Sequence, residues 1–399
     1  MTASSPPPAR TRAPDFALLA GPAPMTDRTL AALGRPPARF GDPSFRDDFR
    51  HAELMVAELM RSPGEILLMG GEAALGLEAA ARALVRPGET RALNLVSGPY
   101  GQAMGRCLRK IGARVDDLAV PWRQAVDPAA VEAYLDRHPQ TSLLTAVHCE
   151  TPCGTINDLA RIGPAARARG VLTLADCVAT LGGMPLQAGD WQLDVVVSAP
   201  HKCLGGPSGL SLVSVSDRAW DAIERNPDAP RDSYLSVRDW REHWHGKNRF
   251  PYTPFAAAVQ ALAAACEQAL EEGLDACIAR HAAAARACRA GAGAMGLALW
   301  PDNPAAAADC VTAVEVPAGL DHETVRRHMR GRYGVATSPD AGVGNLIRIA
   351  HMGPAASGLY PVAGLMALGQ ALADLGAAVR IGDGIEAALG SVSAAAPAC

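Results

Sequence analysis

The chain has 399 residues, of which 49% are apolar, and a formal net charge of −4 at pH 7. This length suits a large domain with a smaller one, and the charge gives no sign of a nucleic-acid or membrane-surface partner. No apolar run reaches the roughly 18 residues that a membrane-spanning helix needs. Residues 1–14 are rich in Pro, Ser and Ala and lack the apolar stretch of a secretory signal, so we expect a flexible tail.

Ten cysteines are scattered along the chain without a C-x-x-C motif. In a long chain without a secretory signal, such cysteines are typically reduced thiols of a cytoplasmic protein. We therefore expect a cytoplasmic location and no metal site.

From residue 64 onward, short apolar runs alternate with helix-like segments. The predicted strands are EILLMG (65–70), RALNLVSG (91–98), RVDDLAV (114–120), TSLLTAVHC (141–149), VLTLAD (171–176), LDVVVS (193–198) and LSLVSVS (210–216). The helices between them are expected over 73–85, from about 101, from about 127 and around 158–169. This alternation predicts an α/β fold with a mostly parallel sheet, seven-stranded by this count, covered by helices on both faces.

An Ala-rich helical stretch follows from residue 255 to about 295, with a break near Gly273. Beyond it the pattern predicts a strand, a helix, a strand and a helix at 311–317, 321–332, 346–352 and 359–375. We therefore expect a large domain over 15–285 and a small C-terminal α/β domain over 286–399.

Ligands of parallel sheets bind at the carboxyl ends of the strands, so polar residues directly after the strands are candidates for chemistry. They are Glu72, Ser97, Gly98, Tyr100, His148, Glu150, Thr151, Asp176, His201 and Lys202.

The segment SAPHKCLGGPSGL (198–210) places Lys202 between a predicted strand and a Gly- and Pro-rich turn. A lysine at a strand end inside a cleft loses hydration, which lowers its pKa and gives a neutral amine that can attack an aldehyde. Lys202 is therefore a candidate nucleophile. The alternative is a solvated surface lysine, since lysines are usually exposed.

Two further residues have the chemistry of a substrate site. Asp176, in LADCVATLGG (174–183), ends a predicted strand. Its carboxylate could keep a pyridine nitrogen protonated, or it could cap a helix. Arg348, in RIAHMGP (348–354), lies in an apolar segment where a guanidinium needs a planar anion. That anion is a substrate carboxylate or the partner of an internal salt bridge.

Taken in order, eight segments resemble the class V aminotransferases of the alanine/serine–glyoxylate group, which have the fold-type I architecture of pyridoxal 5′-phosphate-dependent transferases. They are LLAGPAP (18–24), GLEAA (76–80), SGPYG (97–101), CETPCGTIN (149–157), LADCVAT (174–180), SAPHKCLGGPSGL (198–210), YTPF (252–255) and RIAHMG (348–353).

The resemblance implies that Lys202 forms the Schiff base with a pyridoxal ring and acts as the general base, while Asp176 holds the ring nitrogen. It also implies that Val178 packs on one ring face and Tyr100 on the other. Thr151 would contact the ring near its hydroxyl group.

By the same resemblance, Arg348 binds the substrate carboxylate. The family works as dimers, often paired into tetramers, whose active sites lie between subunits. Phe250 and Thr253 would therefore reach the site of a partner subunit.

Several segments are most similar to members of the family that break down vitamin B6, in which the ring compound is a substrate without phosphate. These segments are GEAALGLEAA (71–80), CETPCGTIN (149–157), KCLGGPSGL (202–210), LSVRDW (235–240), FPYTP (250–254) and RIGDGIEAAL (380–389). The similarity implies transfer of the amino group of pyridoxamine to pyruvate or a similar small 2-oxo acid, giving pyridoxal and an amino acid.

The loop at residues 70–74 gives a physical reason for an unphosphorylated ring. Phosphate-binding members present N–H groups and hydroxyls of a Gly/Ser loop at a helix N-terminus. Glu72 in this loop would oppose a phosphate dianion about 4 Å away at a cost of roughly 1–4 kcal/mol, whereas it could accept a hydrogen bond from the hydroxymethyl group of pyridoxamine. The alternative for Glu72 is a carboxylate that interacts with the dipole of the following helix.

Two further positions differ from the phosphate-binding members. Phe250 replaces a tyrosine that reaches the phosphate, and His201 stands where a glutamine is common. A third departure concerns the oxo acid that accepts the amino group. Pro339 occupies the position at which the similar family members have a second arginine, nine residues before Arg348. The identity of the oxo acid therefore stays open.

Two other functions remain as alternatives. One is an ordinary pyridoxal 5′-phosphate-dependent alanine- or serine–glyoxylate-type aminotransferase, or a biosynthetic relative acting on an unusual amine. The other is a non-catalytic binding protein for vitamin B6 compounds.

Overall fold

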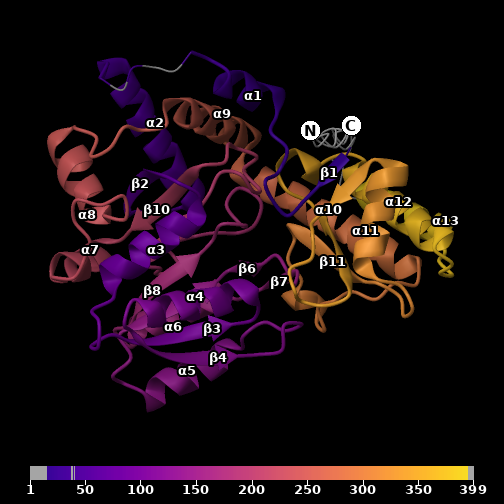
Figure 1. Cartoon of the computed structure of the whole chain (residues 1–399), viewed down its shortest axis with the longest axis horizontal. Helices are drawn as coiled ribbons and strands as arrows, with labels where there is room; N and C mark the ends of the chain where they lie inside the picture. Colours follow the sequence, from indigo (N-terminus) through magenta and orange to yellow (C-terminus); the bar gives the residue numbers. More distant parts are fainter. Residues whose placement is uncertain (1–15, 37–38, 40, 394–399) are drawn as a thin grey trace, which may run out of the picture.

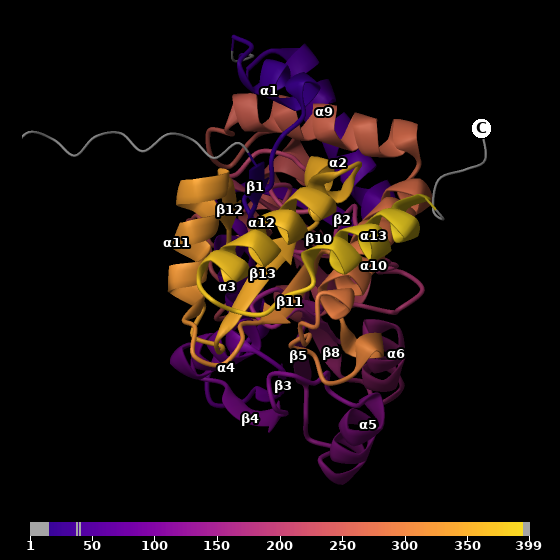
Figure 2. The ribbon, with the colours of Figure 1, turned by 90° about the vertical axis from the view of Figure 1, so that its right-hand side faces the viewer.

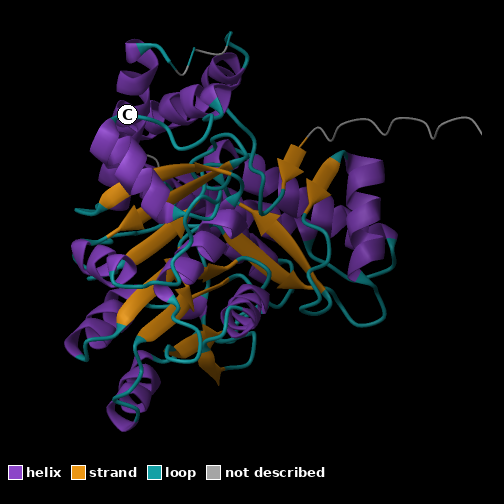
Figure 3. Cartoon of the chain, turned by 60° about the vertical axis from the view of Figure 1, so that its left-hand side comes forward, coloured by secondary structure: helices purple, strands orange, loops and turns teal. Residues whose placement is uncertain are grey.

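The computed structural model describes residues 16–36, 39 and 41–393, so the tail predicted over 1–14 lies outside the described residues. A seven-stranded sheet forms the centre of the larger unit, with strand order β2-β10-β9-β8-β5-β3-β4. Its strands are β2 (Glu65–Gly70), β3 (Arg91–Val96), β4 (Arg114–Ala119), β5 (Leu143–Val147), β8 (Leu172–Asp176), β9 (Val195–Ser198) and β10 (Leu210–Val215). Only β10 runs antiparallel to its neighbours, which confirms the predicted mostly parallel sheet (Figure 3).

Helices lie on both faces of this sheet, as strands that are apolar along their whole length require (Figure 1). The helices of the larger unit are α1 (Asp27–Leu33), α2 (Pro43–Met60), α3 (Ala73–Leu84), α4 (Pro99–Lys110), α5 (Pro128–Arg137), α6 (Leu159–Ala168), α7 (Asp217–Glu224), α8 (Val237–Asp239) and α9 (Ala256–Glu272), with a π-helical turn at Trp240–His245. Helix α1 packs on α9. None of the helices among the described residues is long and apolar enough to cross a membrane.

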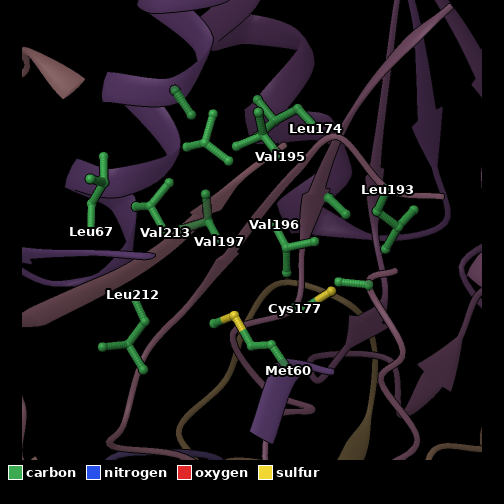
Figure 4. Packing of buried hydrophobic residues seen from close by; sticks show 14 of the residues in the cluster. Met60, Leu67, Leu174, Cys177, Leu193, Val195, Val196, Val197, Leu212 and Val213 are labelled. Atoms are coloured by element: carbon green, nitrogen blue, oxygen red, sulfur yellow. The ribbon is translucent and has the colours of Figure 1, made fainter. Parts of the chain in front are cut away.

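The central strands are buried on both faces. Val195, Val196 and Val197 of β9 are each at most 1% exposed. Because side chains alternate along a strand, Val196 points toward Met60 on one face, whereas Val195 and Val197 point to the other (Figure 4). Helix α3 covers the second face closely, since a Cβ at Gly76 would lie only 3.1 Å from the side chain of Val197.

The residues after α9 form a smaller unit with its own apolar core (Figure 2). Its elements are α10 (Leu274–Ala294), β11 (Val311–Glu315), α11 (His322–Tyr333), β12 (Val335–Thr337), β13 (Leu346–Ala350), α12 (Tyr360–Asp374) and α13 (Ile381–Ser393), with 3-10 turns at Pro304–Ala306 and Gly353–Ala356. The helix break predicted near Gly273 is present, because α9 ends directly before this glycine and α10 begins directly after it.

The first described strand, β1 (Phe16–Leu18), pairs with the C-terminal unit rather than with the large sheet. It runs parallel to β12, with Phe16 opposite Val335, and buried Leu18 packs in the core of the smaller unit. The division into 15–285 and 286–399 stays a prediction, and this strand crosses it.

A short hairpin connects the sheet edge with the smaller unit. Strands β6 (Cys149–Glu150) and β7 (Thr155–Ile156) pair antiparallel. The turn between them reaches the C-terminal unit, because the carbonyl oxygen of Gly154 accepts a hydrogen bond of 2.9 Å from the backbone N–H of Ala308. The hairpin therefore brings the two units together beside the carboxyl ends of the strands.

Candidate active site

The loops after several parallel strands line one cavity of about 190 Å³, called the strand-edge cavity below. Strands β2, β3, β5, β8 and β9 point the same way, so the loops that follow them meet at one edge of the sheet. The lining residues are Glu72, Ala73, Ala74, Leu77, Tyr100, Cys149, Thr151, Asp176, Val178, Ala179, His201 and Lys202. The predicted nucleophile and all predicted ring contacts except Phe250 and Thr253 are among them.

Lys202 differs from the other lysines of this chain in its surroundings. The chain has three lysines, and Lys110 and Lys247 are exposed whereas Lys202 is half-buried. Its ammonium group donates a hydrogen bond to the carbonyl oxygen of Ala20. Burial lowers the pKa of Lys202, while nearby acidic groups, with Cys310 the strongest, act in the opposite direction. Lys202 is therefore not a solvated surface lysine, and its environment favours the neutral amine.

Gly21 directly follows Ala20, whose carbonyl oxygen accepts the hydrogen bond of Lys202. The backbone of Gly21 lies against the lysine side chain. Gly21 has a φ of +106°, and a Cβ at this residue would overlap the side chain of Lys202, with its Cε only 2.6 Å away. Any other residue would therefore be strained and would displace the amine. The sequence assigned no role to Gly21, because a contact with a residue 181 positions later leaves no local signal.

Three buried thiols lie next to the lysine. The Sγ atoms of Cys149 and Cys310 are 3.4 Å apart, and the thiol of Cys203 donates to the carbonyl oxygen of Ala179 at 3.1 Å. Hydrogen bonds from Cys149 and Cys203 lower the pKa of Cys310. All nine cysteines among the described residues are free thiols, and within 16–36, 39 and 41–393 no group of ligands suited to a metal ion is found.

Asp176 ends β8 and presents its carboxylate to the strand-edge cavity. One of its oxygens, Oδ1, accepts a 3.0 Å hydrogen bond from the backbone N–H of Val178. No helix begins at this point, so the helix-cap alternative does not apply. Burial raises the pKa of Asp176 to about 6, although the Val178 N–H and the charge of Lys202 act against this rise. The carboxylate is thus ionised at neutral pH and suited to a cationic partner in the cavity.

Tyr100 and Val178, the residues predicted to enclose a flat ring, both line the strand-edge cavity. Tyr100 lies in the first turn of α4 and is 44% exposed, and Val178 follows Asp176 after β8. Burial raises the pKa of the Tyr100 hydroxyl, whereas hydrogen bonding to Thr151 lowers it. Thr151 itself is buried and directly follows β6.

Two polar side chains of the strand-edge cavity have unused hydrogen-bonding capacity. Glu72 occupies the cap position of α3, but its side chain makes no capping hydrogen bond and is exposed. His201 is buried, which lowers its pKa to about 4 and keeps the imidazole neutral. Its Nδ1 has no hydrogen-bond partner among the described residues. A small heterocycle with polar substituents would fit this chemistry, since it would supply partners for both groups.

Arg348 lies on β13 and is only 7% exposed. Its guanidinium donates to the carbonyl oxygens of Thr151, at 3.4 Å, and of Pro339. Within the described part of the chain no carboxylate lies within ion-pair distance, so the internal salt bridge considered from the sequence is not found. Burial lowers the pKa of Arg348, and an unpaired buried guanidinium of this kind gains from an anionic ligand.

The two residues predicted to serve a partner subunit lie away from the cavity of their own chain. The ring of Phe250 stacks on that of Trp244 with centroids 4.2 Å apart and also contacts Phe49. Thr253 is exposed. Their proposed role toward a second subunit stays a prediction.

Glu150, one of the polar residues that follow the predicted strands, has a buried carboxylate. It accepts hydrogen bonds from the backbone N–H groups of Tyr100, at 3.1 Å, and of Gly101, at 2.6 Å. Burial raises the pKa of Glu150 to about 7. No local sequence pattern predicts that this side chain reaches from β6 to the start of α4, 49 residues earlier.

Known proteins resemble this chain over most of its length. The family model for class-V aminotransferases matches residues 45–339. A pyridoxamine–pyruvate transaminase of Mesorhizobium japonicum is 40% identical over 383 residues, which cover 96% of this chain and 97% of that protein.

Solved structures agree with the sequence comparison. The crystal structure of pyridoxamine–pyruvate aminotransferase from Mesorhizobium loti superposes with a TM-score of 0.94 at 39% identity, covering 96% of this chain and 98% of the other. The ureidoglycine–glyoxylate aminotransferase of Bacillus subtilis superposes with a TM-score of 0.89 at 27% identity, covering 94% of this chain and 97% of the other.

Proposed function

This chain belongs to the class-V aminotransferases, and we propose that it transfers the amino group of pyridoxamine to pyruvate or a similar small 2-oxo acid, giving pyridoxal and an amino acid. Members of the family depend on pyridoxal 5′-phosphate. In the proposed reaction the ring enters without phosphate, as substrate, and leaves as product.

The observation that carries this proposal is the charge of the strand-edge cavity. Its lining holds two carboxylates, Glu72 and Asp176, and the only basic side chains among the described lining residues are Lys202, whose pKa burial lowers, and the neutral His201. The carboxylate of Glu72 would repel a phosphate dianion beside it, whereas a neutral hydroxymethyl group would donate a hydrogen bond to it.

We assign the ring contacts as follows. Asp176 would hold the ring nitrogen in its protonated form, Tyr100 and Val178 would enclose the two ring faces, and Thr151 would lie near the ring hydroxyl. His201 and Glu72 would meet the ring's polar substituents. A protonated pyridine ring, when bound, withdraws electrons from the carbon atoms attached to it.

The proton transfers are assigned to Lys202. Its buried amine, whose pKa burial lowers, would in the neutral form remove a proton from the amine-bearing carbon of pyridoxamine and return one to Cα of the new amino acid. Arg348 would bind the carboxylate of the oxo acid, beside Thr151, and so orient the keto carbon toward the amine.

A direct assay tests the proposed function. Purified protein, dialysed and free of added phosphate esters, should convert pyridoxamine and pyruvate to pyridoxal and alanine, which absorbance and amino-acid analysis detect. Protein that keeps a phosphorylated cofactor through dialysis and acts on amino acids without added pyridoxamine would instead support the phosphate-dependent alternative. Ring binding without any transamination over many oxo acids would support the non-catalytic one.

Replacing Glu72 by alanine is expected to raise the KM for pyridoxamine by about tenfold, because a hydrogen bond to a charged acceptor is lost. The same change should reduce the discrimination against pyridoxamine 5′-phosphate, since a negative charge near the phosphate disappears. Steady-state kinetics with both amines measure the two effects. The exposed Glu89 provides a matched Glu89→Ala control. Unchanged constants for both amines in Glu72→Ala would contradict the assignment.

Replacing Arg348 by glutamine is expected to raise the KM for pyruvate by about 10- to 100-fold, because a charge-assisted pair with the carboxylate is lost. The dissociation constant of pyridoxamine, measured by absorbance titration, should stay within about twofold, since Arg348 is not among the residues lining the strand-edge cavity. Arg327→Gln on α11, whose side chain is 69% exposed, is the control. Equal KM values for pyruvate in wild type and Arg348→Gln would show that Arg348 does not bind the carboxylate of the oxo acid.

We also propose that the enzyme is a cytoplasmic homodimer or homotetramer with active sites between subunits, to which Phe250 and Thr253 contribute. Exposed Thr253 and the 54% exposed side chain of Phe255 support a contact surface in this segment. The nine free thiols among the described residues agree with a reducing compartment. Sedimentation velocity gives the subunit number, and a monomeric active enzyme would contradict the shared site.

A further inference from the structure

Among the described residues, Glu150 is the one buried carboxylate beside the strand-edge cavity that no step of the proposed reaction uses. It is 0% exposed, and its two oxygens accept the N–H groups of Tyr100 and Gly101 in the first turn of α4. Unpaired N–H groups of a helix N-terminus favour a negative partner, usually the side chain of the residue that caps the helix. Here the partner comes from a different element, 50 residues later in the sequence.

A glycine at the start of α4 makes room for the side chain of Glu150. The cap residue of α4 is Gly98, which offers no side chain of its own. A Cβ at Gly98 would lie 2.5 Å from Cδ and 2.6 Å from Oε2 of Glu150. The absence of a side chain at Gly98 thus leaves the space in which the carboxylate of Glu150 reaches the helix.

The connection joins two walls of the strand-edge cavity. Tyr100, on one wall, has its backbone N–H bound by Glu150. Thr151, on another wall, is the next residue in the chain after Glu150. A single carboxylate therefore fixes the distance between the aromatic side chain and the hydroxyl that the proposed ring would touch. The carboxylate also adds negative charge beside Asp176.

We propose that Glu150 is a positioning residue for the ring substrate: it anchors the start of α4 to β6, holds Tyr100 over the ring, and strengthens the negative field in which the ring nitrogen stays protonated. This proposal rests on the proposed function, because it takes the occupant of the strand-edge cavity to be a pyridoxamine-type ring.

The titratable groups that face Glu150 determine how this carboxylate affects the pH dependence of kcat/KM. They are Asp176 on β8, Tyr100 on α4, and the thiols of Cys149 and Cys153 in the hairpin segment. Burial raises the pKa of Glu150 to about 7, and the charge of Asp176 acts in the same direction. Burial also raises the pKa of Asp176 to about 6, and there the charge of Glu72 acts in the same direction. Both must be ionised in the proposed resting enzyme. We therefore expect the acid limb of kcat/KM to fall between pH 6 and 7.

Glu150→Gln removes the charge and leaves the shape. The dissociation constant of pyridoxal, titrated by absorbance at pH 8, should rise about tenfold, because one charge-assisted hydrogen bond to the helix is lost. The variant lacks the group whose pKa is about 7 and keeps Asp176, whose pKa is about 6, so the acid limb of kcat/KM should move to lower pH. A residue that only stabilised the fold would lower activity without moving this limb.

Gly98→Ala separates the two effects and serves if Glu150→Gln does not fold. Its Cβ pushes the carboxylate away from α4 but keeps the charge, so binding should weaken while the acid limb does not move to lower pH. The matched controls are Glu386→Gln on α13, which is exposed, and Gly293→Ala on α10, where a Cβ meets nothing within 4 Å. Both should behave as wild type.

Two outcomes would overturn the proposal. One is a folded Glu150→Gln protein whose pyridoxal affinity and acid limb equal those of wild type. The other is a Gly98→Ala protein with wild-type affinity. Failure of the proposed function would look different, because the wild type itself would then bind no pyridoxal or transfer no amino group from pyridoxamine.

Discussion

Replacing Lys202 by alanine is expected to lower the transamination rate by at least about 10³-fold, because the proposed proton transfers lose their base and the cavity loses its amine. Lys202 is the only lysine of the chain that is not exposed, and no other described lining residue of the strand-edge cavity carries an amine. Steady-state rates with pyridoxamine and pyruvate measure the loss. Near-normal kcat in the variant would refute the assignment of Lys202.

A covalent trap gives a second readout of the same residue. Borohydride added to the enzyme with pyridoxal should attach the ring to one lysine, and peptide mass spectrometry should find it on the peptide that contains Lys202. Exposed Lys247 provides the control, since Lys247→Ala should keep both activity and labelling. Labelling of Lys110 or Lys247 in place of Lys202 would contradict the site.

Replacing Asp176 by asparagine is expected to lower kcat by about 10²- to 10³-fold, because a buried ion pair with the ring nitrogen loses one partner. The amide cannot hold the nitrogen in its protonated form, so the ring withdraws electrons less effectively. Rates across pH 5–9 and the absorption spectrum of bound pyridoxal measure the effect, because the protonated and neutral rings absorb differently. A variant with wild-type kcat and spectrum would remove Asp176 from the mechanism.

The same substitution has an opposite expected effect on the empty protein. The pKa of Asp176 is raised to about 6 by burial, so its stabilising protonated form is lost as the pH rises through 6, and the ionised form costs folding free energy above that value. Asp176→Asn should therefore unfold at a higher temperature than wild type at pH 8 without ligand. Asp190 is exposed, so Asp190→Asn is the control, and it should change neither kcat nor the unfolding temperature.

The sequence predicted those features that follow from local patterns. Each central strand is a short apolar run, and the order of strands and helices requires a parallel sheet whose carboxyl ends meet. The meeting of Asp176 and Lys202 at one cavity follows from that rule alone. The family resemblance added Val178, which has no chemical signal of its own, and implied a role at the ring face for Tyr100.

Contacts between distant segments could not be predicted in this way. Strand β1 has three residues and finds its partner, β12, more than 300 positions later. In the sequence Glu150 does not differ from other polar residues that follow a strand. Only the structure shows that it binds the start of α4. The surroundings of Arg348 were equally open, because the sequence allowed an internal salt bridge that the described residues do not contain.

The pairing of β1 with β12 has a consequence for biosynthesis. Ribosomes release the amino end first, so Ala20, which accepts the hydrogen bond of Lys202, emerges together with a strand whose only partner is still untranslated. A nascent chain that stops before residue 335 cannot form this pairing, and contacts of such long sequence separation form slowly. Catalytic competence should therefore arise only after translation is nearly complete, and truncated products should be inactive even when their central sheet has folded.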